Sequence, residues 1–161
     1  MNQEVLASKQ ALVNEIVEKA KAAKSLTIAE YRGLTVAEIQ TLRRALREEK
    51  TEMCVYKNSL VERAVKELGY EGLDEYLTGP NALFFSEDIS SGPKVLTKYA
   101  RKFGDSLTIK GGYVEGRTLD RAGVTEISKL PSKEGLISMF LSCLQAPIRQ
   151  FAATVKAVAE K

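Results

Sequence analysis

The sequence predicts an α/β (α+β) fold in which a layered N-terminal domain of about four strands flanked by helices precedes a C-terminal helical spine. Helical and strand-like patterns alternate over most of the chain, whereas its final part contains helical patterns alone. The composition, with 44% apolar and 28% charged residues among 161, is that of a folded protein. We therefore expect two domains, 1–130 and 131–161.

The helices of the N-terminal domain are predicted by apolar residues that recur three or four positions apart. The expected helices are 5–20, 36–49, 60–68 and 91–103. Thr35 and Glu38 form a capping-box pattern before the second helix, and Gly69 ends the third. Asn58 or Ser59 can cap the third helix. Each helix is thus separated from the next by a short segment.

Four short strands are expected in these segments. They are 26–31, 51–56, 81–85 and 107–114. Each is a run of apolar or alternating residues beside turn-forming residues, such as the Gly79–Pro80 pair. The last strand contains Gly111 and Gly112, which lack the spacing of a phosphate-binding loop and instead predict a turn or a β-bulge.

The C-terminal spine begins after a boundary at Leu130 and Pro131. Apolar residues at helical spacing resume at Leu136. We expect Pro147 to break this helix, because proline has no backbone N–H and its ring clashes with the preceding turn. The segment 147–161 is therefore predicted to be a separate, partner-binding helix.

Several features argue against an enzyme. The chain has no histidine, which is the commonest general base and metal ligand, and no nucleophile has an evident base. Cys54 and Cys143 are isolated, and we expect both to remain thiols. We therefore predict no catalytic residue, no metal and no cofactor.

The chain has no signal-peptide core and no apolar run long enough to cross a membrane, which predicts a cytoplasmic protein.

Aromatic and cationic residues in the first third of the chain are compatible with RNA binding. Tyr31, Arg32 and Gly33 place a ring, a guanidinium and an unshielded backbone together at a strand end. Further polar and basic residues follow on the second helix and after the next strand: Arg43, Arg44, Arg47, Lys57 and Asn58. The alternative is a plain strand end and a solvated helix face, because glutamates are interspersed and the net charge is only +3.

The segment 147–161 carries an apolar stripe that requires a packing partner. The stripe consists of Ile148, Phe151, Ala152, Val155, Val158 and Ala159. An isolated helix of this length is marginally stable in water, so it packs either on its own domain or in a groove of another protein. Arg149, Lys156 and Lys161 against Glu160 favour an acidic protein partner. A membrane surface is the weaker alternative, since Phe151 is the only aromatic residue of the segment.

Five longer motifs follow one another along the chain. They are AEYRGLTVAEIQTLRRALRE from Ala29, VYKNSLVERA from Val55, TGPNALFFSED from Thr78, KGGYVEG from Lys110 and KLPSKEGL from Lys129. In this order and at this spacing they closely resemble the family of bacterial large-subunit ribosomal protein ten, the stalk-base protein. The resemblance covers most of the chain.

The resemblance implies a ribosome-bound protein without catalytic activity. It implies that the N-terminal domain binds large-subunit rRNA in the GTPase-associated region, beside ribosomal protein eleven. It also implies that 147–161 holds dimers of the acidic stalk protein, which recruit translation GTPases; two dimers are expected, because this segment is short for the family. The RNA-binding roles that it assigns fall on Tyr31, Arg32, Gly33, Arg43, Arg44, Arg47, Lys57, Asn58, Gly79 and Pro80. The alternative function is a small cytosolic adaptor that acts through its C-terminal helix without binding RNA.

Overall fold

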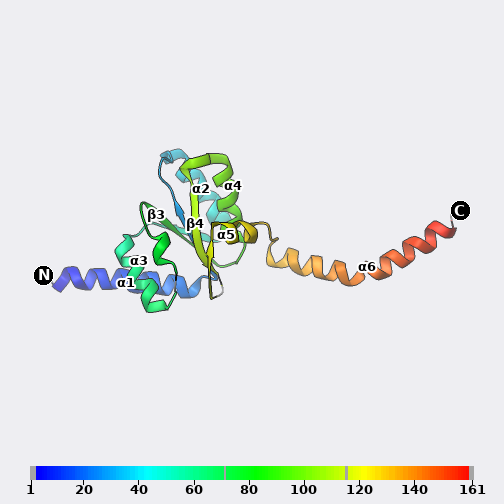
Figure 1. Ribbon diagram of the computed structural model, residues 1–161, viewed down its shortest axis with the longest axis horizontal. Helices are drawn as coiled ribbons and strands as arrows, with labels where there is room; N and C mark the ends of the chain where they lie inside the picture. Colours follow the sequence, from blue (N-terminus) through cyan, green and yellow to red (C-terminus); the bar gives the residue numbers. More distant parts are fainter. Residues whose placement is uncertain (1–2, 71, 115, 160–161) are drawn as a thin grey trace. The chain divides into compact units, whose positions relative to one another are not determined.

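The computed structural model describes residues 3–70, 72–114 and 116–159, and the side chains of residues 3–6 and 105 lie outside this description. The chain divides into two compact units, 1–129 and 130–161. The first contains a β-sheet with helices on both faces, and the second contains one long helix (Figure 1). The predicted α/β (α+β) fold class is confirmed.

Helices and strands alternate through the first unit. Its elements are α1 (Gln3–Ala22), β1 (Ser25–Glu30), α2 (Val36–Glu48), β2 (Thr51–Cys54), α3 (Asn58–Leu68), η1 (Asp74–Tyr76), β3 (Asn81–Ser86), α4 (Ser91–Phe103), η2 (Gly104–Ser106), β4 (Thr108–Val114), β5 (Arg117–Asp120) and α5 (Arg121–Ser128). The two elements η1 and η2 are short 3₁₀ turns. Every helix and strand predicted for this unit is present, with ends that differ by a few residues.

The described residues form a sheet of five strands rather than the four expected from the sequence. All neighbouring pairs are antiparallel, and the order β2-β3-β1-β4-β5 places β1 in the middle. The additional strand β5 has four residues and buries none of their side chains, so the apolar pattern that reveals a strand is missing from it. Pairing with β4, rather than its own residue pattern, makes this segment a strand.

Side chains that alternate along the strands supply a separate apolar core on each face of the sheet. On one face, Leu26 and Ile28 of β1 pack against α1 and α3. On the other, Phe84 of β3 packs with Leu42 of α2 and Leu96 of α4. Figure 1 shows α1 and α3 on the opposite side of the sheet from α2 and α4. Because helices cover both faces, the loops at the strand ends and the edge strands remain accessible.

Strand β4 contains a β-bulge beside its paired glycines, which confirms the bulge expected there. The pairing between β1 and β4 shifts between Ile28 and Ala29, so that Lys110 is the extra residue. A Cβ atom on Gly111 would lie 2.8 Å from the carbonyl oxygen of Leu119, a distance that real Cβ atoms do not adopt. Glycine therefore lets the strands approach, and the bulge redirects the side chain of Lys110.

A cluster of polar contacts around Lys19 holds α1 to the edge strand β2. The Lys19 Nζ lies 3.0 Å from Glu15 Oε1 on the same helix and 3.2 Å from Glu52 Oε1 on β2. It also donates to the Tyr56 hydroxyl at 3.4 Å, which in turn donates to Glu15 Oε1 at 3.0 Å. The hydrogen bond to Glu15 is the main cause of a raised Lys19 pKa, and the same bond lowers the pKa of Glu15.

Replacing Lys19 with Met is expected to lower the free energy of unfolding by about 1 kcal/mol near neutral pH, because three groups lose a shared cation. Folding raises the pKa of Lys19, so its contribution is complete below the ordinary pKa of 10.5 and is lost as the pH rises above that value. Urea denaturation should therefore show a smaller difference between Lys19→Met and wild type at about pH 11 than at about pH 8.

Lys21→Met provides the matched control, because Lys21 is exposed on the same helix. This variant should differ little from wild type at either pH. A Lys19→Met difference that stays constant with pH would contradict the role assigned to the ammonium group.

The described residues of the second unit contain a single helix, α6 (Lys133–Ala159), which continues through Pro147. The prediction that 147–161 forms a separate helix is therefore wrong; residues 160 and 161 lie outside the described part of the chain. Proline removes one N–H donor and disturbs one turn, whereas the segments on both sides are rich in helix-forming residues. Figure 1 shows α6 bending along its length, as an internal proline leads one to expect.

Candidate nucleic-acid interface

Three of the predicted RNA-binding segments lie together at one end of the sheet. Glu30 pairs with Asn81, which places the end of β1 beside the start of β3. Strand β2 also ends here, because it runs antiparallel to β3. The loops that follow β1 and β2 and precede β3 are therefore neighbours. We call their predicted residues the strand-end group: Tyr31, Arg32, Gly33, Lys57, Asn58, Gly79 and Pro80.

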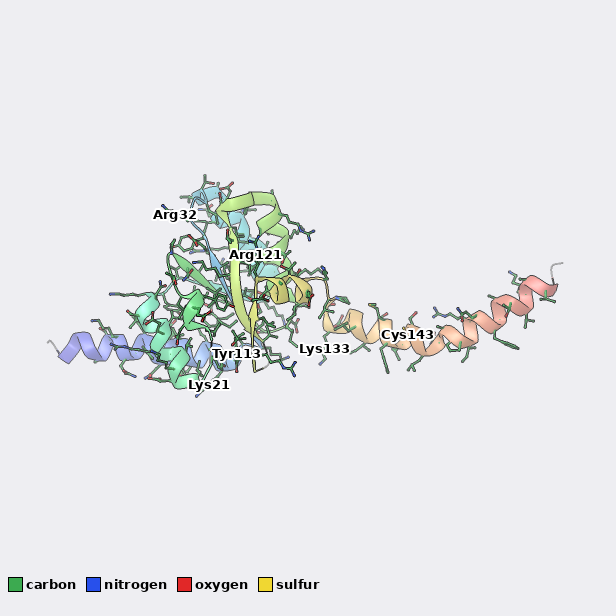
Figure 2. All side chains as sticks on the ribbon, viewed as in Figure 1. Lys21, Arg32, Tyr113, Arg121, Lys133 and Cys143 are labelled. Atoms are coloured by element: carbon green, nitrogen blue, oxygen red, sulfur yellow. The ribbon has the colours of Figure 1, made fainter. Side chains whose placement is uncertain are left out.

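The loop between β1 and α2 presents Arg32 to solvent and keeps Tyr31 half-buried against the core. Gly33 has a φ of 98°, a conformation that favours glycine. The predicted capping box is confirmed: Glu38 accepts a hydrogen bond from the Thr35 backbone at 2.8 Å, and the Thr35 side chain accepts one from the Glu38 backbone. The loop is thus fixed at both ends, and Arg32 extends from it (Figure 2).

Asn58 connects two loops of the strand-end group, because its Nδ2 donates a hydrogen bond to the Gly79 carbonyl oxygen at 2.9 Å. The expectation that Asn58 or Ser59 caps α3 is wrong. Lys57 occupies the cap position, and no side chain forms a capping hydrogen bond there. The Asn58 amide acts between loops instead of within the helix, while Lys57 and Pro80 remain exposed.

Lys110 supports the same end of the sheet, and sequence reasoning did not include it. Its Nζ lies 3.0 Å from Glu30 Oε2 and also donates to the carbonyl oxygen of Thr78. The bulge in β4 gives the side chain this direction. A cation next to the expected bulge was the signal that could have identified it. Lys110 therefore positions the loop that leads into Gly79 and Pro80.

The three predicted arginines of α2 form a second group, which the structure does not bring together with the strand-end group. Arg43, Arg44 and Arg47 are exposed, and no described residue forms an ion pair with them. Arg43 and Arg47 line a groove of about 200 Å³ beside the edge strand β2. The groove includes Thr51, the first residue of β2, which lies toward the opposite end of the sheet.

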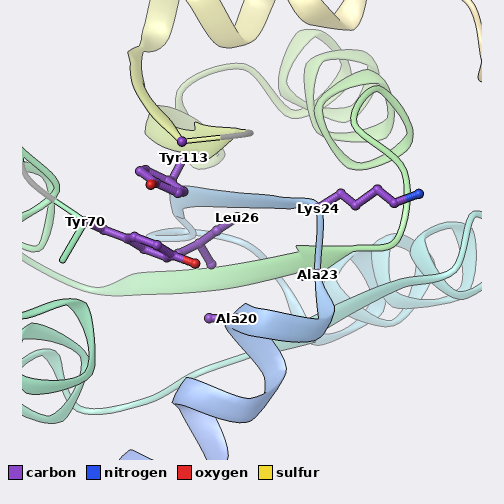
Figure 3. A pocket seen from close by; sticks show the side chains of 7 residues that line it. Ala20, Ala23, Lys24, Leu26, Tyr70 and Tyr113 are labelled. Atoms are coloured by element: carbon purple, nitrogen blue, oxygen red, sulfur yellow. The ribbon is translucent and has the colours of Figure 1, made fainter. Parts of the chain in front are cut away.

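The opposite end of the sheet holds a small pocket beside two stacked tyrosines (Figure 3). The ring centroids of Tyr70 and Tyr113 are 3.7 Å apart, and the rings are inclined by 19°. The pocket has a volume of about 260 Å³ and is also lined by Ala20, Lys24 and Leu26. Burial, and then the neighbouring Tyr113, raise the pKa of Tyr70. The stacked rings connect the segment after α3 with β4. None of the predicted RNA-binding residues lines the pocket.

Helix α6 buries none of its described residues, so its apolar side chains face solvent. All six residues predicted to bind a partner are exposed, with Phe151 at 72% and Val158 at 76%. Seven of the exposed large apolar residues recur with alternating spacings of four and three along the helix: Ile137, Leu141, Leu144, Ile148, Phe151, Val155 and Val158. We call this set the α6 stripe. Such spacing is typical of a helix that packs lengthwise against other helices, and it begins before Pro147.

Residues 3–70, 72–114 and 116–159 contain no helix that is long and apolar enough to span a bilayer. Within the same ranges, no group of histidine, cysteine and acidic side chains has a geometry that could hold a metal ion. Cys54 and Cys143 are free thiols, as the sequence predicts.

Comparison with known proteins finds similarity along nearly the whole chain. Residues 4–101 match the family model of ribosomal protein L10, and residues 130–161 match that of the ribosomal protein uL10 C-terminal region. The large ribosomal subunit protein uL10 of Bacillus licheniformis is 48% identical over 155 residues, which cover 96% of this chain and 93% of the relative. The uL10 proteins of Macrococcus caseolyticus and Shouchella clausii are also 48% identical. The alignment with the first covers 100% of this chain and 94% of the relative, and the alignment with the second covers 98% of this chain and 95% of the relative.

Proposed function

Because the chain belongs to the ribosomal protein L10 family, and is therefore a protein of the large ribosomal subunit, we propose that it forms the base of the ribosomal stalk. In this proposal the first unit binds large-subunit rRNA, and α6 holds dimers of the acidic stalk protein that recruit translation GTPases. The protein acts as a scaffold in the cytoplasm and catalyses no reaction. One observation supports the proposal: the first unit has exposed cationic loops, and the second has an exposed apolar stripe.

The strand-end group supplies the RNA contacts of this proposal. Arg32 and Lys57 are exposed and bind phosphates, and the half-buried ring of Tyr31 stacks on a base with the part that is open to solvent. Asn58 and Gly79 hold the loops in place through their hydrogen bond. The arginines of α2 bind phosphates further along the RNA. The RNA is the GTPase-associated region, next to ribosomal protein eleven.

Helix α6 is the spine for the stalk dimers. Its 27 residues correspond to a length of about 40 Å at 1.5 Å per residue. Within these residues, Lys133, Arg149 and Lys156 outnumber the single acidic residue Glu134, which favours an acidic partner. We propose that two dimers bind, with contacts to Ile148, Phe151, Ala152, Val155, Val158 and Ala159.

A second candidate function is that of an adaptor that acts through α6 alone. The exposed α6 stripe supports it independently of any RNA contact. The two functions are distinguished by mixing the full chain with a transcript of the GTPase-associated region. A stalk-base protein binds this RNA with and without the acidic protein, whereas the adaptor does not bind it.

Replacing Arg32 with Ala is expected to weaken binding of the GTPase-associated transcript of Bacillus licheniformis by about tenfold, because a guanidinium–phosphate contact is lost. The salt dependence of the affinity should become shallower by about one unit, since one fewer counterion is released. Filter binding at several salt concentrations measures both quantities.

Arg117→Ala is the matched control. Arg117 is exposed at the start of β5 and pairs with Val114, so it lies at the end of the sheet opposite to the strand-end group. The Arg117→Ala variant should keep both the affinity and the salt dependence near their wild-type values. Equal effects of Arg32→Ala and Arg117→Ala would show that general charge, and not the strand-end group, binds the RNA.

A further inference from the structure

A depression of about 390 Å³ lies between the end of α4, the start of β4 and the start of α5. Arg101 of α4 and Arg121 of α5 line it from two different helices. Both are exposed, and no described residue forms an ion pair with either. Thr108 and Thr125 add polar side chains to the lining. We call this depression the α4–α5 groove.

The groove continues into a cationic side of α4. Lys94, Lys98, Arg101 and Lys102 are exposed and lie within about 100° of one another around the helix. The helix contains no acidic residue. Cations in its last turn are favoured by the helix dipole, so Arg101 and Lys102 alone are compatible with an ordinary solvated helix end.

The helix dipole does not explain the position of Arg121. It is the first residue of α5, where the helix dipole disfavours a positive charge and favours a negative one. The neighbouring Asp120 carboxylate accepts a hydrogen bond from the Gly123 backbone at 2.8 Å as the helix cap, and it forms no ion pair with Arg121 or Arg101. Two guanidinium groups thus share one groove beside a helix N-terminus, and an anion bound there would offset the unfavourable position of Arg121 in the helix dipole.

The groove opens at the same end of the sheet as the strand-end group. Thr108, which lines the groove, pairs with Glu30 at the end of β1. Ser106, two residues earlier, approaches Gly33 closely: its Oγ would lie 3.4 Å from a Cβ atom at that position. Figure 2 shows Arg32 and Arg121 in the half of the first unit that is opposite to Tyr113 and Lys21. A polymer bound at Arg32 can therefore pass over Ser106 to the groove.

We propose that the α4–α5 groove binds a second segment of the same RNA, with Arg101 and Arg121 clamping its phosphates. This inference rests on the proposed rRNA-binding function and extends it to a surface that none of the predicted RNA-binding residues touches. Paired guanidiniums suit phosphate oxygens because each can donate two parallel hydrogen bonds. RNA is favoured over an acidic protein segment because the groove is continuous with the strand-end group.

The test is filter binding of the GTPase-associated transcript of Bacillus licheniformis by the full chain and by Arg101→Ala/Arg121→Ala. The double variant should bind about tenfold more weakly at physiological salt. Its salt dependence should become shallower by about two units, twice the change expected for Arg32→Ala, because two phosphate contacts are lost. The control Lys21→Ala/Arg117→Ala also removes two exposed cations, but at the other end of the sheet, and should leave both values unchanged.

Two further measurements keep the result interpretable. Thermal unfolding of the RNA-free double variant should occur close to the wild-type temperature, because the helix dipole disfavours Arg121 but favours Arg101. Arg101→Lys/Arg121→Lys keeps the charges but loses bidentate geometry, so it should retain the wild-type salt dependence and bind with intermediate affinity. Hydroxyl-radical footprinting should show two protected stretches of RNA with wild type and one with the alanine double variant.

The outcomes separate this inference from the proposed function. If Arg32→Ala weakens RNA binding and Arg101→Ala/Arg121→Ala does not, the groove proposal is overturned and the rRNA-binding function stands; an acidic protein segment is then the better occupant. If the wild-type chain does not bind the transcript at all, the proposed function itself fails. Loss of one protected stretch of RNA in Arg101→Ala/Arg121→Ala, with the other stretch retained, supports RNA binding in the α4–α5 groove.

Discussion

Deleting residues 147–161 is expected to abolish binding of the acidic stalk protein while leaving the affinity for rRNA unchanged. The deletion removes all six predicted partner-binding side chains, each of which is exposed on α6 and makes no contribution to the two cores of the first unit. Buried apolar contacts dominate the affinity of helix-in-groove complexes, so their loss should leave no measurable binding. Native mass spectrometry of the mixed proteins measures the outcome directly.

The full chain should carry two dimers in the same experiment. A spectrum with one or three dimers per chain would contradict the predicted length of the spine. Partial binding by the deletion variant would place part of the interface on the α6 stripe before Pro147, which runs from Ile137 to Leu144. Phe151→Asp/Val155→Asp in the full chain provides a second test, because it changes two side chains of the stripe without shortening the helix.

Replacing Phe84 with Ala is expected to lower the free energy of unfolding of the first unit by about 3–5 kcal/mol. Phe84 is 0% exposed in β3 and packs between the sheet and the helices α2 and α4. The lost transfer energy and the remaining cavity both contribute, and no polar group compensates for them. Since a domain of this size is stable by about 5–15 kcal/mol, a large part of its stability would disappear. RNA binding should be lost with it at elevated temperature.

Urea denaturation followed by tyrosine fluorescence is the appropriate measurement for Phe84→Ala. The chain has no tryptophan, and its six tyrosines all lie in the first unit, so the signal does not report on α6. Phe151→Ala makes the same change at a side chain that is 72% exposed. That control should leave the unfolding curve unchanged and weaken binding of the stalk protein. A loss below about 1 kcal/mol for Phe84→Ala would contradict its central place in the core.

The sequence predicted most of the fold because its strongest local signals agree with the tertiary structure. The Thr35–Glu38 capping box, the Gly69 helix end and the bulge beside Gly111 depend on neighbours in the chain, and all three are present. Strand β5 escaped prediction because only pairing with β4 defines it. The expected break of the helix at Pro147 does not occur, because helix-forming residues on both sides outweigh one missing hydrogen-bond donor.

The candidate interface was less predictable, because it depends on the strand order. Nothing local indicates that the loops around Arg32, Lys57 and Gly79 become neighbours; the antiparallel pairing of three strands brings them together. Asn58 shows the same limit. Its place before a helical pattern predicts a helix cap, but its amide instead donates a hydrogen bond to the carbonyl oxygen of Gly79, which lies 21 residues later in the sequence. Arg101 and Arg121 had no sequence signal, since they lie on different helices.

The central position of β1 has a consequence for how this chain folds during its own synthesis. Both neighbours of β1 in the sheet, β3 and β4, come much later in the sequence. The first strand to leave the ribosome must therefore wait unpaired until most of the first unit has followed it, at a synthesis rate of about 5–20 residues per second. Such long-range pairing also makes folding slow. The N-terminal half of the nascent chain is thus the part most in need of protection from aggregation.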